Sequence, residues 1–189
     1  MERINVSESF RMCNTNTHFE MRFEGKADTK KALEAMLEVI DPNKYEEPYL
    51  PAFSPLFIQD LGDNRTDKGF DFDSSLRSYE YEDLIPAMLK AVAKALPEMP
   101  FKGYSCFDAT NCYDIHEIEF SYNGKQLYLK NTYKNDECGY FCPDCGCFIA
   151  GVDEEFDSDE IECEDCEEAF KVADLKYIPA EVREETIEF

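Results

Sequence analysis

The sequence predicts an α+β protein, with an antiparallel sheet that has two helices on one face and a small cysteine-rich module after the sheet. Three observations support this class. Residues 28–40 and 83–96 repeat apolar side chains at helical spacing, and residues 101–133 contain three strand-like segments. Two Cys-x2-Cys pairs follow within residues 142–166. A chain of 189 residues is long enough for one ordinary domain and a small module.

The chain begins with a polar segment, residues 1–17, that is expected to be a loose arm, followed by a half-buried strand at residues 18–24. Three apolar residues alternate with polar ones in that strand: Phe19, Met21 and Phe23. Asp28 stands where an N-cap side chain can accept a hydrogen bond from the first turn of the next helix. The apolar face of this helix consists of Leu33, Met36, Leu37 and Ile40. Pro42 is expected to end it, because proline disfavours helical geometry in the residue before it.

Residues 41–78 form a long connection that contains four prolines. The apolar residues between positions 53 and 61 predict a short strand or a covering turn. Residues 62–75 are expected to be a mobile loop and a candidate for binding a partner, because connections of this length are usually functional or disordered. A second helix then begins at Asp83 and tolerates Pro86 in its first turn, where a missing N–H costs little.

The last three strands are predicted at residues 101–108, 115–122 and 125–133. Asn123-Gly124 is a dipeptide that two-residue hairpin turns prefer, so Tyr122 is expected to pair with Lys125. The apolar pairs then face the helices, and a slip by one residue would reverse every face. This register gives five cross-strand pairs: Phe120 with Leu127, Ile118 with Leu129, His116 with Asn131, Glu117 with Lys130, and Glu119 with Tyr128.

The order of these elements resembles a ferredoxin-like α+β sandwich or a near relative, at the level of the fold alone. The chain is therefore divided into an α+β domain (residues 1–137), a cysteine module (residues 138–173) and an acidic C-terminal tail (residues 174–189). The tail is expected to form one helical turn. Only four residues separate the last strand from the cysteine module, so the module should extend directly from the sheet.

The cysteine module contains the pattern Cys-x2-Cys-x17-Cys-x2-Cys, formed by Cys142, Cys145, Cys163 and Cys166. Two residues between cysteines allow a tight turn to direct both sulfurs at one cation, and four thiolates suit tetrahedral zinc. Short apolar segments beside each pair favour strands. The module resembles a zinc ribbon, which implies one structural zinc per chain. With four thiolates bound, such a zinc has no open position for a catalytic water.

Three alternatives to zinc follow from the same cysteines. A disulfide framework is disfavoured because nine is an odd number and because no secretory signal precedes the domain. A thioredoxin-type motif would need a helix beginning at Cys142. Iron remains an alternative, because Cys142-Pro143-Asp144-Cys145-Gly146 also resembles a rubredoxin knuckle. Cys138 and Cys147 lie near the first pair as further thiols, and Cys147 is the better candidate for a substitute ligand.

The chain has a formal net charge of −23 at pH 7. Eleven of the sixteen residues in 153–168, here named the acidic lobe, are Asp or Glu. Phosphate backbones are bound through Lys and Arg, so direct binding of nucleic acid is not expected. The acidic lobe is either a solvated face or a docking surface for a basic protein partner. Its candidate contacts are Asp153, Glu154, Glu155, Asp157, Asp159 and Glu160.

These observations predict a non-catalytic zinc protein that acts as an interaction module or inhibitor, in the extreme case as a mimic of nucleic acid. A compact, acidic chain without a catalytic motif resembles, in general character, accessory and anti-defence proteins of phages and mobile elements. The sequence contains no phosphate-binding loop and no zinc-hydrolase motif. Because it has no apolar stretch of spanning length and its thiols suit a reducing compartment, we expect a cytoplasmic protein without membrane contact.

Two other functions stay open. One is a rubredoxin-like iron electron carrier. The other is a cysteine-dependent enzyme that uses Cys106 or Cys112 beside His116, which are spaced Cys-x5-Cys-x3-His. In the predicted register His116 lies on the apolar face, which favours a core histidine with the cysteines acting as small apolar residues.

Overall fold

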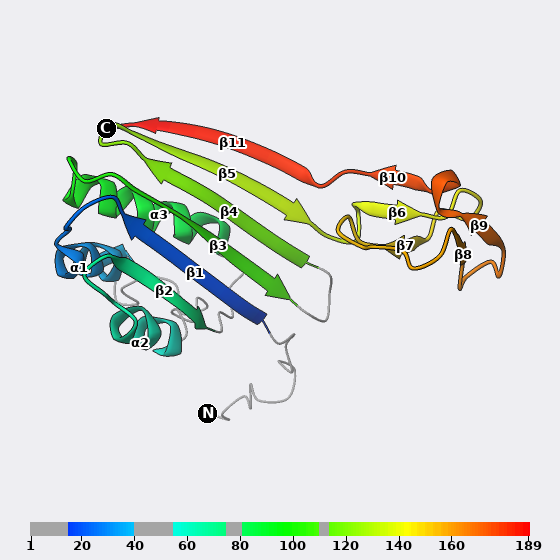
Figure 1. Cartoon of the computed structure of the whole chain (residues 1–189), viewed down its shortest axis with the longest axis horizontal. Helices are drawn as coiled ribbons and strands as arrows, with labels where there is room; N and C mark the ends of the chain where they lie inside the picture. The colour runs from blue at the N-terminus through cyan, green and yellow to red at the C-terminus, as the bar shows by residue number, and fades with distance from the viewer. Residues whose placement is uncertain (1–14, 40–54, 75–80, 110–113) are drawn as a thin grey trace, which may run out of the picture.

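The computed structural model describes residues 15–39, 55–74, 81–109 and 114–189. Its main feature is a six-stranded sheet in the order β11-β5-β4-β3-β1-β2, in which every neighbouring pair is antiparallel (Figure 1). The strands of this sheet are β1 (Thr15–Phe23), β2 (Gly69–Ser74), β3 (Phe101–Ala109), β4 (Asp114–Tyr122), β5 (Gln126–Lys134) and β11 (Glu181–Glu188).

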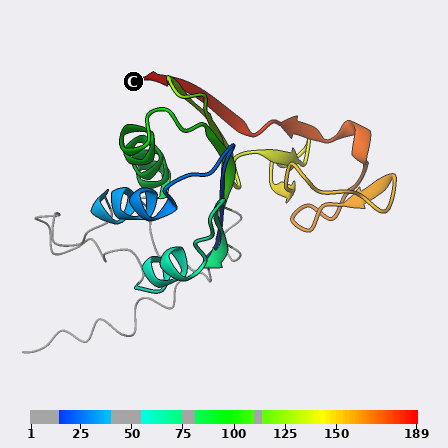
Figure 2. The ribbon, with the colours of Figure 1, turned by 60° about the vertical axis from the view of Figure 1, so that its left-hand side comes forward.

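Three helices lie on one face of the sheet, as the view in Figure 2 shows: α1 (Thr29–Val39), α2 (Pro55–Asp63) and α3 (Tyr81–Ala95). The apolar core between helices and sheet includes Phe19, Met21, Met36, Phe57, Ile85, Met88 and Leu127, each fully buried. Asp28 caps α1 as the sequence predicts, because its Oδ1 accepts a hydrogen bond from the Lys31 N–H at 3.0 Å. Among the described residues, no helix is long and apolar enough to cross a bilayer.

The α+β class and the antiparallel sheet are confirmed, whereas the ferredoxin-like arrangement is not. That arrangement repeats the split β-α-β unit. The described residues form one such unit, β2-α3-β3 with the antiparallel β1 between its strands, and then continue as the antiparallel neighbours β3, β4 and β5. The helical layer also contains a third helix, α2, that the sequence analysis does not predict.

Two predictions for the long connection are wrong. Residues 55–63 form helix α2, not a strand or turn, and residues 69–74 form the edge strand β2, not a mobile loop. Tertiary contacts explain both, because Phe72 of β2 packs against Phe19 of β1 and Phe57 of α2 at ring distances of 5.7 and 5.4 Å. Other parts of the connection, and residues 1–14 of the arm predicted at residues 1–17, lie outside the described residues. The last three residues of the predicted arm, 15–17, belong to strand β1.

The β4–β5 hairpin has a different register from the predicted one. Tyr122 pairs with Leu127, because Gly124 and Lys125 form the turn in place of Asn123 and Gly124. The Asn123 side-chain oxygen accepts the N–H groups of Lys125 at 2.9 Å and of Gln126 at 2.8 Å. Gly124 has a φ of 92°, which glycine adopts without strain. Each partner moves by two residues, so every side chain keeps its predicted face.

The C-terminal tail is a strand, and the prediction of a helical turn is wrong. β11 pairs with β5 from Glu181 opposite Tyr133 to Glu188 opposite Gln126. The cysteine module therefore lies between two neighbouring strands of the main sheet and is attached at both ends (Figure 1).

The module contains short strands that extend from the main sheet. They are β6 (Gly139–Phe141), β7 (Phe148–Ala150), β8 (Glu160–Glu162), β9 (Ala169–Lys171) and, after a short 3-10 turn, β10 (Lys176–Ile178). β6 pairs with both β7 and β10, and β8 pairs with β9. Because β10 belongs to the same small sheet as β6, the pairing continues past residue 173.

Candidate metal centre

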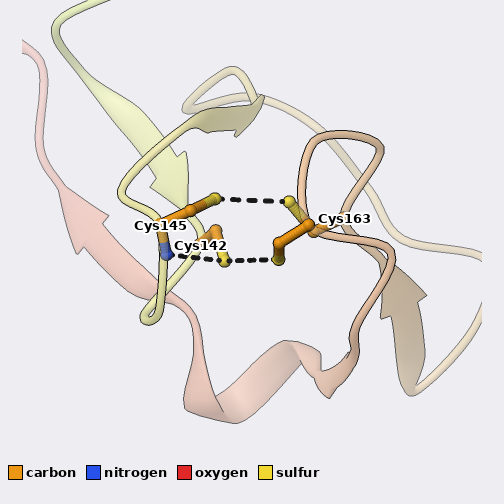
Figure 3. A group of neighbouring side chains, drawn as sticks. Cys142, Cys145 and Cys163 are labelled. Atoms are coloured by element: carbon orange, nitrogen blue, oxygen red, sulfur yellow. Dashed lines mark hydrogen bonds between the residues drawn. The ribbon is translucent and has the colours of Figure 1, made fainter.

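Four cysteine thiols from two hairpin loops meet in the cysteine module. The loops are residues 142–147, named the first knuckle, and residues 163–168, the second knuckle. The Sγ atoms of Cys142, Cys145, Cys163 and Cys166 all lie within 4.8 Å of one another. The separation is 3.7 Å for Cys142 and Cys166, and 3.6 Å for Cys145 and Cys163 (Figure 3). A Zn–S distance of about 2.3 Å places tetrahedral ligands about 3.8 Å apart, so this cluster can hold one metal ion.

The two knuckles share one backbone geometry. In each, the N–H of the first cysteine donates to the carbonyl five residues later, at 2.9 Å in both. The N–H four residues later donates back to the carbonyl of that cysteine, at 3.0 Å in the first knuckle and 2.8 Å in the second. The residue after the second cysteine has a positive φ, 75° at Gly146 and 58° at Glu167. This repeated turn directs both pairs of sulfurs to one point.

Hydrogen bonds favour the thiolate form of the first cysteine in each knuckle. Burial acts to raise the pKa of Cys142, but N–H groups of the first knuckle outweigh it, so the pKa is lowered. The Cys145 N–H lies 3.5 Å from the Cys142 sulfur. The pKa of Cys163 is lowered to about 6, chiefly because the Cys147 thiol donates a hydrogen bond to it. The Glu168 N–H acts to lower the pKa of Cys166, but burial and the neighbouring sulfurs raise it to about 12.

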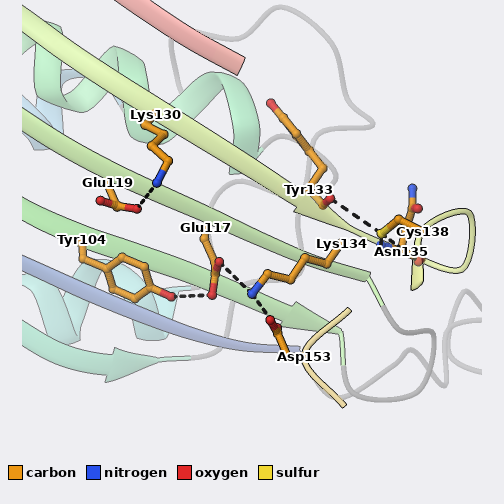
Figure 4. Close-up of polar contacts among 9 residues, drawn as sticks. All are labelled: Tyr104, Glu117, Glu119, Lys130, Tyr133, Lys134, Asn135, Cys138 and Asp153. Atoms are coloured by element: carbon orange, nitrogen blue, oxygen red, sulfur yellow. Dashed lines mark hydrogen bonds and ion pairs between the residues drawn. The ribbon is translucent and has the colours of Figure 1, made fainter. Parts of the chain in front are cut away.

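A fifth sulfur contacts the cluster. The Cys147 Sγ lies 3.2 Å from that of Cys145 and 3.1 Å from that of Cys163. Cys138, the other extra thiol, is buried at the turn between β5 and β6, where its sulfur accepts the Asn135 N–H at 3.2 Å (Figure 4). Cys147 therefore belongs to the surroundings of the site, and Cys138 supports the turn that leads to it.

The acidic lobe joins the two knuckles and surrounds the second. All six predicted contact residues are exposed. Phe156 attaches this loop to the small sheet, because its ring packs edge-on against Tyr140 at 4.9 Å. The carboxylate of Asp153, however, bonds to Lys134 Nζ at 2.6 Å. Five of the six carboxylates are thus displayed outward, and the sixth connects the lobe to the main sheet.

Lys134 is a residue that the sequence analysis misses. Its ammonium group lies between Glu117 of β4 at 2.9 Å and Asp153 at 2.6 Å, with only 12% of its side chain exposed. Tyr104 extends the network by donating to Glu117 Oε1 at 3.1 Å (Figure 4). Glu117 and Asp153 lie 17 and 19 residues away from Lys134 along the chain. No local sequence pattern therefore reveals this network.

The structure does not bring Cys106 and His116 together. In the β3–β4 register Phe107 pairs with His116, whereas Cys106 pairs with Glu117. Successive residues of a strand point to opposite faces, so the thiol and the imidazole lie on opposite faces of the sheet. Burial is also the main cause that raises the pKa of Cys106, which disfavours a reactive thiolate. Cys112 lies outside the described residues.

His116 belongs to an aromatic cluster. Its ring lies 6.0 Å from Phe107 and 4.9 Å from Tyr133, both edge-on. Its Nε2 and the Asp114 carboxylate form a hydrogen bond of 2.9 Å. The sequence predicts a core histidine opposite Asn131, whereas the residue opposite His116 across the hairpin is Tyr133, and the Asp114 carboxylate belongs to the same strand as His116.

Comparisons of the chain with protein-family models, with curated proteins and with solved structures found no match. The class that the fold and the site define is therefore an α+β protein with a cluster of four cysteines able to hold a metal ion.

Proposed function

We propose that this chain is a non-catalytic zinc protein that binds a basic protein partner through its acidic lobe. The observation that supports the proposal is the position of the lobe. Its exposed carboxylates lie in the loop between the two knuckles, so one bound metal ion would hold the whole acidic surface in a single shape. A surface that is already ordered loses less conformational entropy on binding than a flexible acidic tail.

The donor set supports a structural zinc. Four thiolates complete a tetrahedral shell and leave no position for substrate or water. The strands of the module are three residues long, and few of its side chains are buried. A module of this size is below the limit at which apolar burial alone stabilises a fold. We therefore infer that zinc supplies most of the stability of the module.

The chemistry of the partner follows from charge. An excess of carboxylates attracts Lys-rich and Arg-rich surfaces and accelerates association with them at low salt. Proteins that bind nucleic acid have such surfaces. The proposed role is therefore that of an interaction module or inhibitor that occupies the nucleic-acid site of its partner, as an anti-defence protein of a phage or mobile element would.

Metal analysis of protein purified without added metal tests the first part. One zinc per chain and no visible colour is the expected result. Iron with visible thiolate charge-transfer bands would replace this proposal with the rubredoxin-like electron carrier, for which the same four thiols are suited.

Binding with matched charge variants tests the second part. The lobe variant replaces Glu154, Glu155, Asp157, Asp159 and Glu160 by their amides, and the control variant does the same at five exposed acidic residues of the helical side: Glu34, Glu38, Asp63, Asp67 and Glu98. Immobilised zinc-loaded protein should capture basic proteins from a lysate, and added duplex DNA should displace them. The lobe variant should lose this capture and the control should keep it. Equal capture by the two variants would reject the acidic lobe as the binding surface.

A further inference from the structure

The five sulfurs of the metal centre exceed the number that one tetrahedral ion can bind. We propose that Cys147 is a site of oxidative modification, at which a disulfide forms between Cys147 and Cys163 and removes one ligand from the metal. This inference rests on the proposed zinc centre. It adds a chemical control to that centre, because the same reaction that joins the two knuckles would release the ion.

The positions of the sulfurs support this pairing. Cys147 Sγ lies 3.1 Å from Cys163 Sγ, which is shorter than the 3.6 and 3.7 Å between the paired ligands. A tetrahedral ion keeps its ligand sulfurs about 3.8 Å apart, so Cys147 does not fit as a further ligand beside Cys163. A disulfide needs an S–S distance of about 2.0 Å, which a movement of about 1 Å would reach.

The exposure of Cys147 and the surroundings of the other thiols also favour Cys147 as the site of oxidation. It is half-buried, so a small oxidant can reach it, whereas Cys163 is fully buried. The remaining described thiols have other surroundings, since Cys138 bonds to Asn135 and Cys106 lies beside Tyr104. Cys145 is a second sulfur neighbour at 3.2 Å. It is only two residues from Cys147, and a disulfide across so short a loop is less favourable than one between the knuckles.

The reaction requires a two-electron oxidant of the peroxide class. Peroxide oxidises the Cys147 thiol to a sulfenic acid, and one water leaves. The Cys163 thiolate then attacks the oxidised sulfur, the S–S bond forms, and hydroxide leaves. In total the two sulfurs lose two electrons and the peroxide is reduced to water and hydroxide. Cys142, Cys145 and Cys166 alone would then hold the metal, and three thiolates would bind it more weakly than four, so it would be released.

The test uses the full zinc-loaded chain and hydrogen peroxide. Zinc release is followed with a colorimetric chelator, and the intact mass is measured in parallel. The variant is Cys147→Ser, and the matched control is Cys138→Ser, which removes the other extra thiol. We expect zinc release to be at least about tenfold slower in Cys147→Ser and unchanged in Cys138→Ser. Digestion of the oxidised, unmutated chain after acidic residues should yield residues 145–153 joined to the peptide that contains Cys163, and fragmentation of the joined peptides should place the bond at Cys147 and not at Cys145.

Two results would overturn the inference: zinc release from Cys147→Ser at the rate of the unmutated chain, or a disulfide map that joins Cys147 to Cys145 or omits Cys147. The mapping uses the unmutated chain, so it decides the question even if the serine variant does not fold. Failure of the proposed zinc centre is visible separately, as absence of zinc before peroxide is added.

Discussion

Lys134 shows how a single side chain can join two parts of a molecule. Its ammonium group has one partner on the main sheet, Glu117, and one on the acidic lobe, Asp153. Burial acts to lower the pKa of Lys134, but the hydrogen bonds to these carboxylates outweigh burial and raise it. Lys134 therefore stays protonated because it is paired. Removing its ammonium group would leave a half-buried Glu117 without its charge partner.

The first prediction concerns this pairing. Lys134→Met should lower the free energy of unfolding by about 1 to 3 kcal/mol, because Glu117 would lose its partner in a partly buried position. Lys130→Met is the matched control, since Lys130 forms a more exposed ion pair with Glu119 at 2.7 Å. That change should destabilise the protein less than Lys134→Met does, because water screens an exposed ion pair. Urea unfolding curves of the two variants measure both values, and equal losses would contradict the assigned role of Lys134.

The second prediction concerns alkaline pH. Burial, followed by the contacts with Cys106 and Glu117, raises the pKa of Tyr104 above its ordinary value of 10.0. The folded state therefore holds this proton more tightly than the unfolded state. The resulting stability is complete below pH 10 and is lost as the pH rises above 10.

Tyr104→Phe should accordingly flatten the fall in stability between about pH 10 and 11. The matched control is Tyr177→Phe, at a tyrosine that is 50% exposed. Urea unfolding at a series of pH values measures the slope for each variant. A slope in Tyr104→Phe as steep as in the unmutated chain would show that Tyr104 is not the group responsible.

At the scale of elements, both knuckles need a residue with positive φ after their second cysteine, and the sequence indicates this position in only one of them. The first knuckle has glycine at its position of positive φ, and the second has Glu167 there with a φ of 58°. The left-handed conformation costs a non-glycine residue about 1 to 2 kcal/mol. The second knuckle therefore contains strain that the first does not have.

The third prediction concerns substitutions at these two positions of positive φ. Glu167→Gly should tighten zinc binding by up to about fivefold, because relief of strain exceeds the entropy that glycine adds to the unfolded chain. Gly146→Ala should weaken binding by a similar factor. A Cβ at Gly146 meets no atom within 4 Å, so its φ of 75° is the only obstacle. Competition with a chelator measures both affinities, and changes of the same sign in the two variants would refute this explanation.

β11 is the element whose identity depends most on its neighbour. Seven of its eight residues are exposed and four are Glu, so its sequence lacks the apolar alternation of an ordinary strand. One face of the strand nevertheless contacts the rest of the fold. Ile187 packs against the core, and the Arg183 guanidinium lies over the Tyr133 ring at 4.8 Å. The many charges suit an edge strand, because they discourage pairing with other chains.

The fourth prediction tests the pairing of β11 with β5. Ile187→Asp should destabilise the fold by about 1 to 3 kcal/mol, because it places a charge against the core. Val182→Asp, on the same strand at a side chain that is 51% exposed, should change stability by less than about 0.5 kcal/mol. Thermal unfolding compares the two. A tail that does not pair with the sheet would tolerate both changes equally.

At the scale of the whole molecule, the cysteine module is an insertion between β5 and β11, so binding of the proposed zinc would be linked to closure of the sheet. A folded module holds the ends of these two strands next to each other. An unfolded module would turn the connection into a long flexible loop, whose closure costs conformational entropy. Loss of the proposed zinc should therefore affect β11, although β11 contains none of the four cysteines.

The fifth prediction measures this linkage. Removing zinc with a chelator should abolish amide-exchange protection in residues 139–171 and reduce it in β11 (Glu181–Glu188). Protection in β3 (Phe101–Ala109) and β4 (Asp114–Tyr122) should persist, because the helices cover these strands and their core does not involve the module. Unchanged protection of β11 in the metal-free protein would show that β11 docks independently of the module.

Features that depend on neighbours along the chain were predictable from sequence. The four clustered cysteines lie in two short turns, α1 has its cap three residues from the group it binds, and apolar and polar side chains alternate in the strands after residue 100. The hairpin register differs from the predicted one because Asn123 uses its side chain to close the turn one residue later. The faces stayed correct because the side-chain period of a strand is two.

By itself, then, the sequence determined the α+β class, two of the three described helices, the faces of the central strands and the cluster of cysteines that can hold a metal ion. Only the tertiary structure decided that residues 55–63 are a helix, that β2 and β11 are the two edges of the sheet, that Lys134 joins the sheet to the acidic lobe, and that Cys106 and His116 lie on opposite faces. The reason is physical: these features depend on partners far away along the chain, and an edge strand or a bridging lysine has no periodic pattern of its own.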